Sequence, residues 1–109
     1  MQQTKLEAFE QYLGYISEKD WVKAYPYHAT DFKMKKDHFS RWVQSWTFDH
    51  LEFDILEDDI FSNNFYQADI VLSQGDKKIF LRKEKFEIFM ENNIWKVRPS
   101  EAFVEALSN

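Results

Sequence analysis

The chain has 109 residues, a formal net charge of −5 and no cysteine. This length predicts one domain covering residues 1–109. The absence of cysteine excludes disulfide bonds and thiolate chemistry. Because the charge is spread over both halves, the sequence lacks the clustered basic face that nucleic-acid binding requires, and we expect no nucleic-acid partner.

No apolar run approaches the ~20 residues that a membrane-spanning helix needs, so no membrane insertion is expected. The first twenty residues are amphipathic and charged, which is not the pattern of a signal peptide. As written, the chain is expected to be cytoplasmic. As a domain excised from a longer chain, it would be extracytoplasmic.

The N-terminal part predicts three helices. Residues 4–18 combine an apolar stripe with a capping-box pattern, Thr4 and Glu7. Gly14 lies inside this helix, and its expected use is close packing against another element. Asp20 caps a short second helix that ends near Pro26, and Asp37 caps a third helix. The inward-facing positions of the three helices are Leu6, Phe9, Leu13, Ile16, Trp21, Ala24, Tyr25, Phe39, Trp42, Val43 and Trp46.

Residues 51–98 predict four antiparallel strands. The first hairpin turn is expected at Asn63-Asn64, because asparagine tolerates the positive φ that such turns need. This turn would pair Phe61 with Tyr66 and Ile55 with Leu72. One face would then carry an apolar set from both strands, namely Leu51, Phe53, Ile55, Phe61, Tyr66, Ala68, Ile70 and Leu72.

The next two turns are expected at Gly75-Asp76 and Asn92-Asn93. The pairs that they predict are Leu72 with Ile79, Ile70 with Leu81, Met90 with Trp95, and Ile88 with Val97.

The third strand changes parity along its length. Its start places odd positions on the inner face, Ile79 and Leu81, whereas its end places even positions there, Phe86, Ile88 and Met90. Since side chains alternate with a period of two, one extra residue must be absorbed between the two halves. We therefore predict a β-bulge within the charged run 82–85, which would curl the sheet into a half-cone.

A short C-terminal helix is predicted after Pro99, with an apolar face formed by Ala102, Phe103, Ala106 and Leu107. It would either cap one open edge of the half-cone or pack on a partner. The predicted fold class is α+β, with three N-terminal helices packed on a strongly curved, bulged four-stranded antiparallel sheet.

Three segments carry a resemblance to a known family. The helix containing Phe9 is followed by Trp-Val-Lys-Ala-Tyr at 21–25, a strand contains Tyr-Gln-Ala-Asp-Ile at 66–70, and a closing hairpin reads Glu-Asn-Asn-Ile-Trp-Lys-Val at 91–97. In this order, the chain resembles the nuclear transport factor 2-like (cystatin-like) superfamily over nearly its whole length. It is most similar to the small accessory domain ahead of some penicillin-binding transpeptidases, and to related uncharacterised bacterial proteins. The tail after Pro99 departs from the usual ending.

This resemblance implies a fold and not one function. Members of the superfamily include isomerases, dehydratases, transport adaptors, immunity proteins and non-catalytic accessory domains. No catalytic residue of the family carries over by motif to this chain.

Glu57 and Asp59 are the candidate catalytic residues. The predicted register places them on the inner face, opposite Ile70 and Ala68. A carboxylate against apolar walls has a raised pKa and could abstract a carbon-bound proton, as in the isomerase branch of the superfamily. The alternative is a rim position or a second bulge that leaves both side chains in water.

Other side chains offer less chemistry. His28, His38 and His50 are too widely spaced for a metal site and are expected to be solvated or helix-terminal, so we predict no metal and no cofactor. Six aromatic residues could line a pocket between helices and sheet, where a small molecule would bind, although helical spacing of aromatics is typical of an ordinary core. They are Trp21, Tyr25, Trp42, Trp46, Tyr66 and Trp95.

The outer face of the sheet is unusually apolar. The residues that alternate with the inner set are Leu56, Ile60, Phe65, Val71, Phe80 and Phe89. Such a face is seldom left wet, so we expect either the C-terminal helix or another chain to cover it. The sequence favours a non-catalytic interaction or accessory domain that forms a homodimer or binds a protein partner. A pocket enzyme using Glu57 or Asp59, and an immunity-type inhibitor of a basic toxin, are the alternatives.

Overall fold

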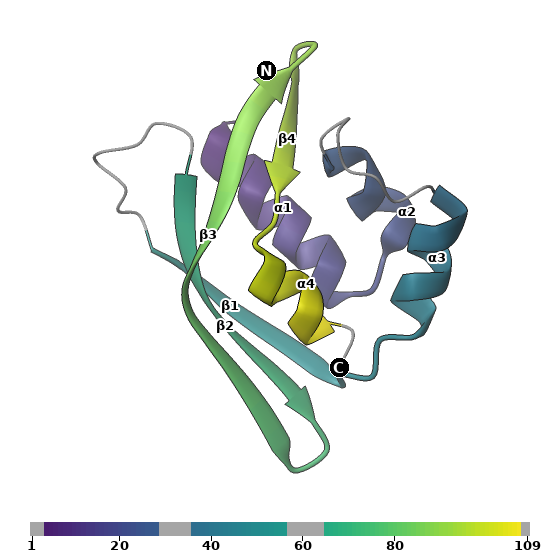
Figure 1. The fold of residues 1–109 in the computed structure, drawn as a ribbon. Coiled ribbons are helices and arrows are strands. Elements are labelled where there is room, and N and C mark those ends of the chain that lie inside the picture. The colour runs from purple at the N-terminus through teal and green to yellow at the C-terminus, as the bar shows by residue number, and fades with distance from the viewer. Residues whose placement is uncertain (1–3, 29–35, 57–64, 108–109) are drawn as a thin grey trace.

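The computed structural model describes residues 4–28, 36–56 and 65–107, apart from the side chains of Trp21 and Lys36. Within these residues the chain is α+β, with helices packed beside a four-stranded antiparallel sheet (Figure 1), as predicted. In chain order, the elements are α1 (Lys5–Ser17), α2 (Trp21–Ala24), the 3₁₀ turn η1 (Tyr25–Tyr27), α3 (Lys36–Gln44), β1 (His50–Leu56), β2 (Phe65–Gln74), β3 (Lys77–Glu91), β4 (Ile94–Arg98) and α4 (Glu101–Leu107).

Helix α1 begins at the predicted capping box. The Thr4 hydroxyl accepts the Glu7 N–H at 3.1 Å, and the Glu7 carboxylate accepts the Thr4 N–H at 3.3 Å. The two bonds satisfy donors that the first helical turn would otherwise leave without partners. The expectation for Gly14 is wrong, because a Cβ at this position would meet nothing within 4 Å. Close packing therefore does not account for this glycine.

The second and third helices are short. The Asp20 carboxylate accepts the Lys23 N–H at 3.3 Å, which confirms the predicted cap of α2. The chain continues as the 3₁₀ turn η1, which has Pro26 in its first turn. Proline lacks an N–H, but at this position the N–H would have no hydrogen-bond partner within the helix. Helix α3 begins at Lys36, so Asp37 lies in its first turn and not at its cap.

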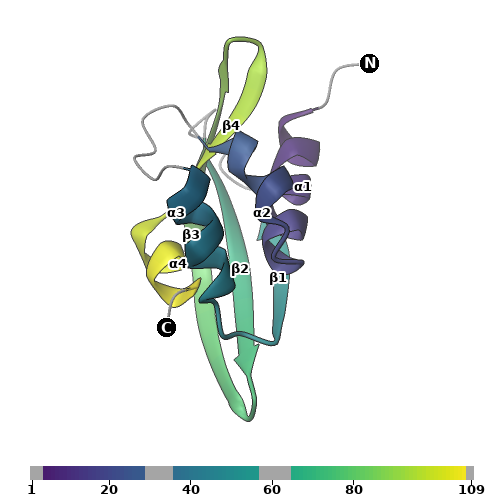
Figure 2. The same ribbon diagram turned by 90° about the vertical axis from the view of Figure 1, so that its right-hand side faces the viewer.

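Helix α4 packs on the same side of the sheet as α1. The Phe103 ring lies 5.0 Å from the ring of Phe86 on β3, and Phe86 lies 4.9 Å from Phe9 on α1. Figures 1 and 2 show the helices gathered on this one side. Of the two predicted roles of the tail, α4 therefore covers the inner side, and it leaves the outer face of the sheet uncovered.

The strand order is β1-β2-β3-β4, and two of the three predicted hairpins are confirmed. Leu72 pairs with Ile79 across the turn at Gly75, and Ile88 pairs with Val97 across Asn92-Asn93. Gly75 has a φ of 58°, and the two asparagines have φ values of 53° and 65°. Positive φ is the conformation that two-residue hairpin turns demand and that glycine and asparagine tolerate.

The predicted register of β1 against β2 is wrong by four residues. Leu51, and not Ile55, pairs with Leu72, while Ile55 pairs with Ala68. A slip by an even number leaves every side chain on its predicted face, so the alternation of apolar residues could not reveal it. The proposed turn at Asn63-Asn64 and its partner Phe61 lie outside the described residues.

The predicted bulge in β3 is confirmed. The pairing shifts by one residue between Ala68–Glu84 and Ile70–Leu81. Arg82 and Lys83 therefore face the single residue Asp69, whose carboxylate accepts the Lys83 N–H at 2.9 Å. Lys83 has a φ of 53°, an uncommon conformation for a residue with a side chain. The β2–β3 ribbon changes direction along its length (Figure 1).

The core lies between the helices and the sheet. Its largest fully buried side chains come from α1, α3, the second half of β3 and α4, and they include Phe9, Tyr12, Phe39, Phe86 and Phe103. In the first half of β3, Ile79 and Leu81 are half-buried. Met90 differs from its predicted core position, since it is 44% exposed near the tip of the last hairpin.

Candidate functional site

A buried polar pair lies at the centre of the aromatic cluster. The Tyr12 hydroxyl on α1 is 2.9 Å from Nε2 of His28, which directly follows η1. The His28 ring packs edge-on against the rings of Tyr12, Tyr25 and Phe39, with centroids 5.4, 6.3 and 5.0 Å away. His28 ends the helical turn η1 as its C-cap, as one of the two predicted alternatives has it, but it is not solvated, because only 6% of this residue is exposed.

Burial determines the charge state of both groups. Desolvation, together with the nearby charge of Lys96, lowers the pKa of His28 to about 3. Burial also raises the pKa of the Tyr12 phenol well above its ordinary value. At neutral pH the pair is thus a neutral imidazole beside a neutral phenol, which is a stable polar contact and a poor proton donor or acceptor.

The backbone around His28 joins this cluster to the sheet. His28 forms a parallel β-bridge with Val97 of β4. The Lys96 ammonium donates a hydrogen bond to the Pro26 carbonyl at 2.6 Å. These contacts attach η1 to the edge of β4 that does not pair with β3. They also place a positive charge near the imidazole.

A second buried polar atom belongs to Trp46. Its indole N–H is buried and has no hydrogen-bond acceptor within the described part of the chain. The ring packs between Trp42 and Phe48, with centroids 4.9 and 5.6 Å away. An unpaired buried donor costs roughly 1–3 kcal/mol, so aromatic packing must offset this loss.

Five of the six aromatic residues predicted to line a pocket pack as part of the core. Tyr25, Trp42, Tyr66 and Trp95 are half-buried against it, and Trp46 is buried. The side chain of Trp21 lies outside the described part. None of these five side chains lines either of the two pockets described below.

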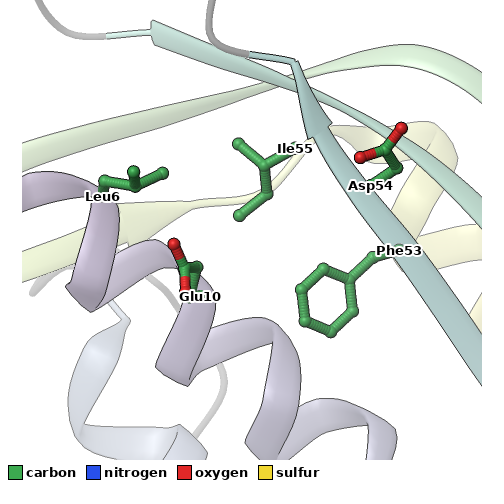
Figure 3. Close-up of a pocket in the computed structure, with 5 residues that line it drawn as sticks. All are labelled: Leu6, Glu10, Phe53, Asp54 and Ile55. Carbon is green, nitrogen blue, oxygen red and sulfur yellow. The ribbon is translucent and has the colours of Figure 1, made fainter.

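The first pocket lies between α1 and β1. Its volume is about 250 Å³, and it is lined by Leu6, Glu10, Phe53, Asp54 and Ile55. Figure 3 shows Leu6, Glu10, Phe53 and Ile55 facing one another across the space, while Asp54 points away from the helix. The lining of the pocket thus combines three apolar side chains with the carboxylates of Glu10 and Asp54.

The second pocket lies beside the start of α4. Its volume is about 260 Å³, and it is lined by Arg98, Pro99, Glu101, Val104 and Glu105. Its polar groups are charged side chains of both signs. Sequence patterns indicated neither pocket. The first joins α1 to β1, which are far apart in the chain, whereas the second is formed by residues 98–105 alone.

The outer sheet face is apolar in two places. Phe80 is 61% exposed and Phe65 is 36% exposed, whereas Leu56, Val71 and Phe89 are half-buried. Arg98, which also bonds the Glu87 carboxylate, lies over the Phe89 ring at 4.8 Å and covers that end of the face. Ile60 lies outside the described residues. The uncovered part of the face is therefore centred on Phe80.

The candidate catalytic residues Glu57 and Asp59 also lie outside the described residues. The positions predicted for them, opposite Ile70 and Ala68, are occupied by Phe53 and Ile55. That placement was wrong because it depended on the slipped register of β1. Among the described residues, no group of three or more His, Asp or Glu side chains could hold a metal ion.

A scan of the sequence against protein-family models finds no match, and a search of curated proteins finds none either. No helix in the described part of the chain combines the length and the apolar character that crossing a membrane requires.

Proposed function

We propose that the chain is a non-catalytic protein-interaction domain of the nuclear transport factor 2-like type, and that it pairs with a second copy through its outer sheet face. The assignment to the superfamily is supported by the order of the elements, with three helices before a bulged antiparallel sheet. A non-catalytic role is supported by the interior, where large aromatic side chains fill the space in which the enzymes of this type would hold a substrate.

The exposed apolar centre of the outer face carries the proposal. Glu52, Val71 and Phe80 form one row across β1, β2 and β3. Every helix packs on the other side of the sheet (Figure 2), so no helix among the described residues covers this row. Removing an exposed phenylalanine and its neighbours from water favours association by roughly 25 cal/mol for each Å² buried.

Charge favours a second copy as the occupant. On the outer face, β1 carries Glu52, whereas β3 carries Lys78 and Arg82 on either side of Phe80. A two-fold axis running along the strands above β2 would place β1 of each copy over β3 of the other. Glu52 would then lie over Phe80 of the partner, between Lys78 and Arg82, and the two Val71 side chains would meet on the axis. A face three strands wide corresponds to the small, weak class of interfaces, with a total area below about 1,200 Å².

Sedimentation equilibrium over a concentration series tests the dimer. We expect a mass of two chains at high concentration and dissociation in the micromolar range. Phe80→Ser should abolish association without loss of stability, because Phe80 is exposed in the monomer. Val22→Ser is the matched control, since Val22 is also exposed, at 55%, but lies on α2.

Charge-reversal variants distinguish the proposed dimer geometry from non-specific association of the apolar face. Glu52→Lys and Lys78→Glu should each weaken the dimer, and the double variant should restore it, because Lys78 flanks the Phe80 over which the partner's Glu52 would lie. A mass of one chain at every concentration would refute the proposal. Equal weakening by the single and double variants would refute the proposed axis.

A further inference from the structure

Strand β1 is an unpaired edge of the sheet. It pairs with β2 on one side, and no strand among the described residues pairs with its other side. Along such an edge, alternate N–H and C=O groups have no partner in the sheet and can pair with an added strand. Beside this edge, α1 and β1 enclose the pocket of about 250 Å³ lined by Leu6, Phe53 and Ile55 (Figure 3).

The two faces of β1 differ in chemistry. Phe53 and Ile55 point toward α1 and the pocket, whereas Asp54 points to the opposite side (Figure 3). Side chains of an added strand would alternate in the same way, since neighbouring strands share their pleat. Every second side chain would enter the pocket, against Leu6, Phe53 and Ile55, and those between would lie beside Asp54.

Charge selects the occupant of this edge. Asp54 and Glu52 lie on the outer face of β1 and are exposed, and Glu10 adds a carboxylate on the α1 side of the pocket. A segment that alternates aliphatic residues with lysine or arginine would fill the pocket and neutralise these carboxylates. An acidic segment would be repelled.

A second copy of this chain fits the edge poorly. Two antiparallel β1 strands would bring Glu52 and Asp54 of one copy against the same carboxylates of the other, and like charges on paired strands are destabilising. Strand β4 has the required alternation, with Lys96 and Arg98 on one face. However, its free side is bridged by His28, and Lys96 is bonded to Pro26.

We propose that the β1 edge binds an extended basic segment of another protein, which joins the sheet as a fifth strand. The segment places aliphatic side chains in the pocket between α1 and β1, and lysine or arginine side chains beside Asp54. The backbone edge of β1 and the pocket lie beside the outer face centred on Phe80 and share only Glu52 with the proposed dimer interface, so the inference does not depend on the dimer.

The test uses the full chain and a short synthetic peptide of alternating lysine and valine, followed by backbone NMR. We expect shift changes centred on His50–Leu56 and slowed amide exchange along β1. N-methylation of alternate peptide amides should abolish binding when it falls on the edge facing β1, and should have little effect on the other edge. A peptide of the same composition with its lysines and valines in separate blocks should bind at least about tenfold more weakly.

Variants of the chain complete the test. Asp54→Lys should weaken peptide binding by about tenfold, whereas Glu101→Lys, which makes the same change of charge on α4, should leave it unchanged. Phe80→Ser should retain peptide binding even though it abolishes the proposed dimer. Shift changes away from β1, equal binding of both N-methylated peptides, or equal effects of the two charge variants would overturn the proposal.

Discussion

The buried imidazole of His28 makes the stability of this protein depend on pH. The pKa of His28 is lowered to about 3 in the folded chain, while an unfolded histidine has a pKa of about 6.5. Between these values the unfolded state binds a proton that the folded state excludes, so stability is lost as the pH falls below about 6.5. Below about pH 3 both states are protonated, and the loss from this residue is complete.

The size of this effect follows from the difference between the two pKa values. They differ by about 3.5, and each pKa unit corresponds to about 1.4 kcal/mol, so the full loss is about 5 kcal/mol. At pH 4.5, about 3 kcal/mol of this is already lost. A domain of this size has a total stability of roughly 5–15 kcal/mol, so the change would be readily measured.

Urea unfolding of the wild type and of His28→Gln between pH 7.5 and 4.5 measures this contribution. Glutamine can accept the Tyr12 hydrogen bond but does not titrate. We expect the variant to be less stable at pH 7.5 and to lose about 3 kcal/mol less than the wild type on acidification. His38→Gln, which removes a histidine at an exposed position, is the control and should lose as much stability as the wild type on acidification. Parallel stability curves for the wild type and His28→Gln would refute the assignment of the acid sensitivity to this residue.

Three further substitutions test the fold by urea unfolding. Lys83→Gly should stabilise the chain by roughly 0.5–1 kcal/mol, because glycine adopts the positive φ of the bulge without strain. Gly14→Ala should stabilise it by a similar amount, because the added methyl group meets open space within a helix. Phe86→Ala should cost roughly 3–5 kcal/mol, whereas Phe80→Ala, at an exposed position, should change the stability by less than about 0.5 kcal/mol. Unchanged stability in either of the first two variants, or equal losses in the last two, would contradict these assignments.

The parts of the fold that the sequence predicts are those fixed by local chemistry. Gly75 and the pair Asn92-Asn93 determine two registers, because a two-residue turn permits one pairing. The change of parity along β3 predicts the bulge at Arg82 and Lys83, since a buried face cannot switch sides otherwise. Each of these features depends on residues that are close together in the chain.

The register of β1 depends on more distant contacts. A slip of four residues keeps Leu51, Phe53 and Ile55 on the inner face, so both registers satisfy the alternation of apolar residues equally. The difference lies in the pairs that form, such as Leu51 with Leu72, and these depend on how α1 and α3 pack on the sheet. The placement of the candidate carboxylates failed for this reason.

The buried pair was not predicted for a related reason. A lone histidine after a proline-containing turn has no local pattern that indicates burial. Its partner, Tyr12, is sixteen residues earlier on α1 and reaches it only when η1 packs beside that helix. Contacts of this kind depend on tertiary packing, which the composition of a single segment does not encode.

His28 also explains why the two edges of the sheet differ. Strand β4 alternates Lys96 and Arg98 with apolar residues, and β1 alternates Glu52 and Asp54 with apolar residues. If both edges were open, these complementary strands would favour head-to-tail pairing of copies, and such contacts form rings or open filaments. The bridge from His28 to Val97 occupies β4, and its attachment depends on the buried contact between His28 and Tyr12. The buried imidazole of His28 therefore belongs both to the aromatic core and to the bridge on β4, and β1 is the edge at which we propose that a partner strand binds.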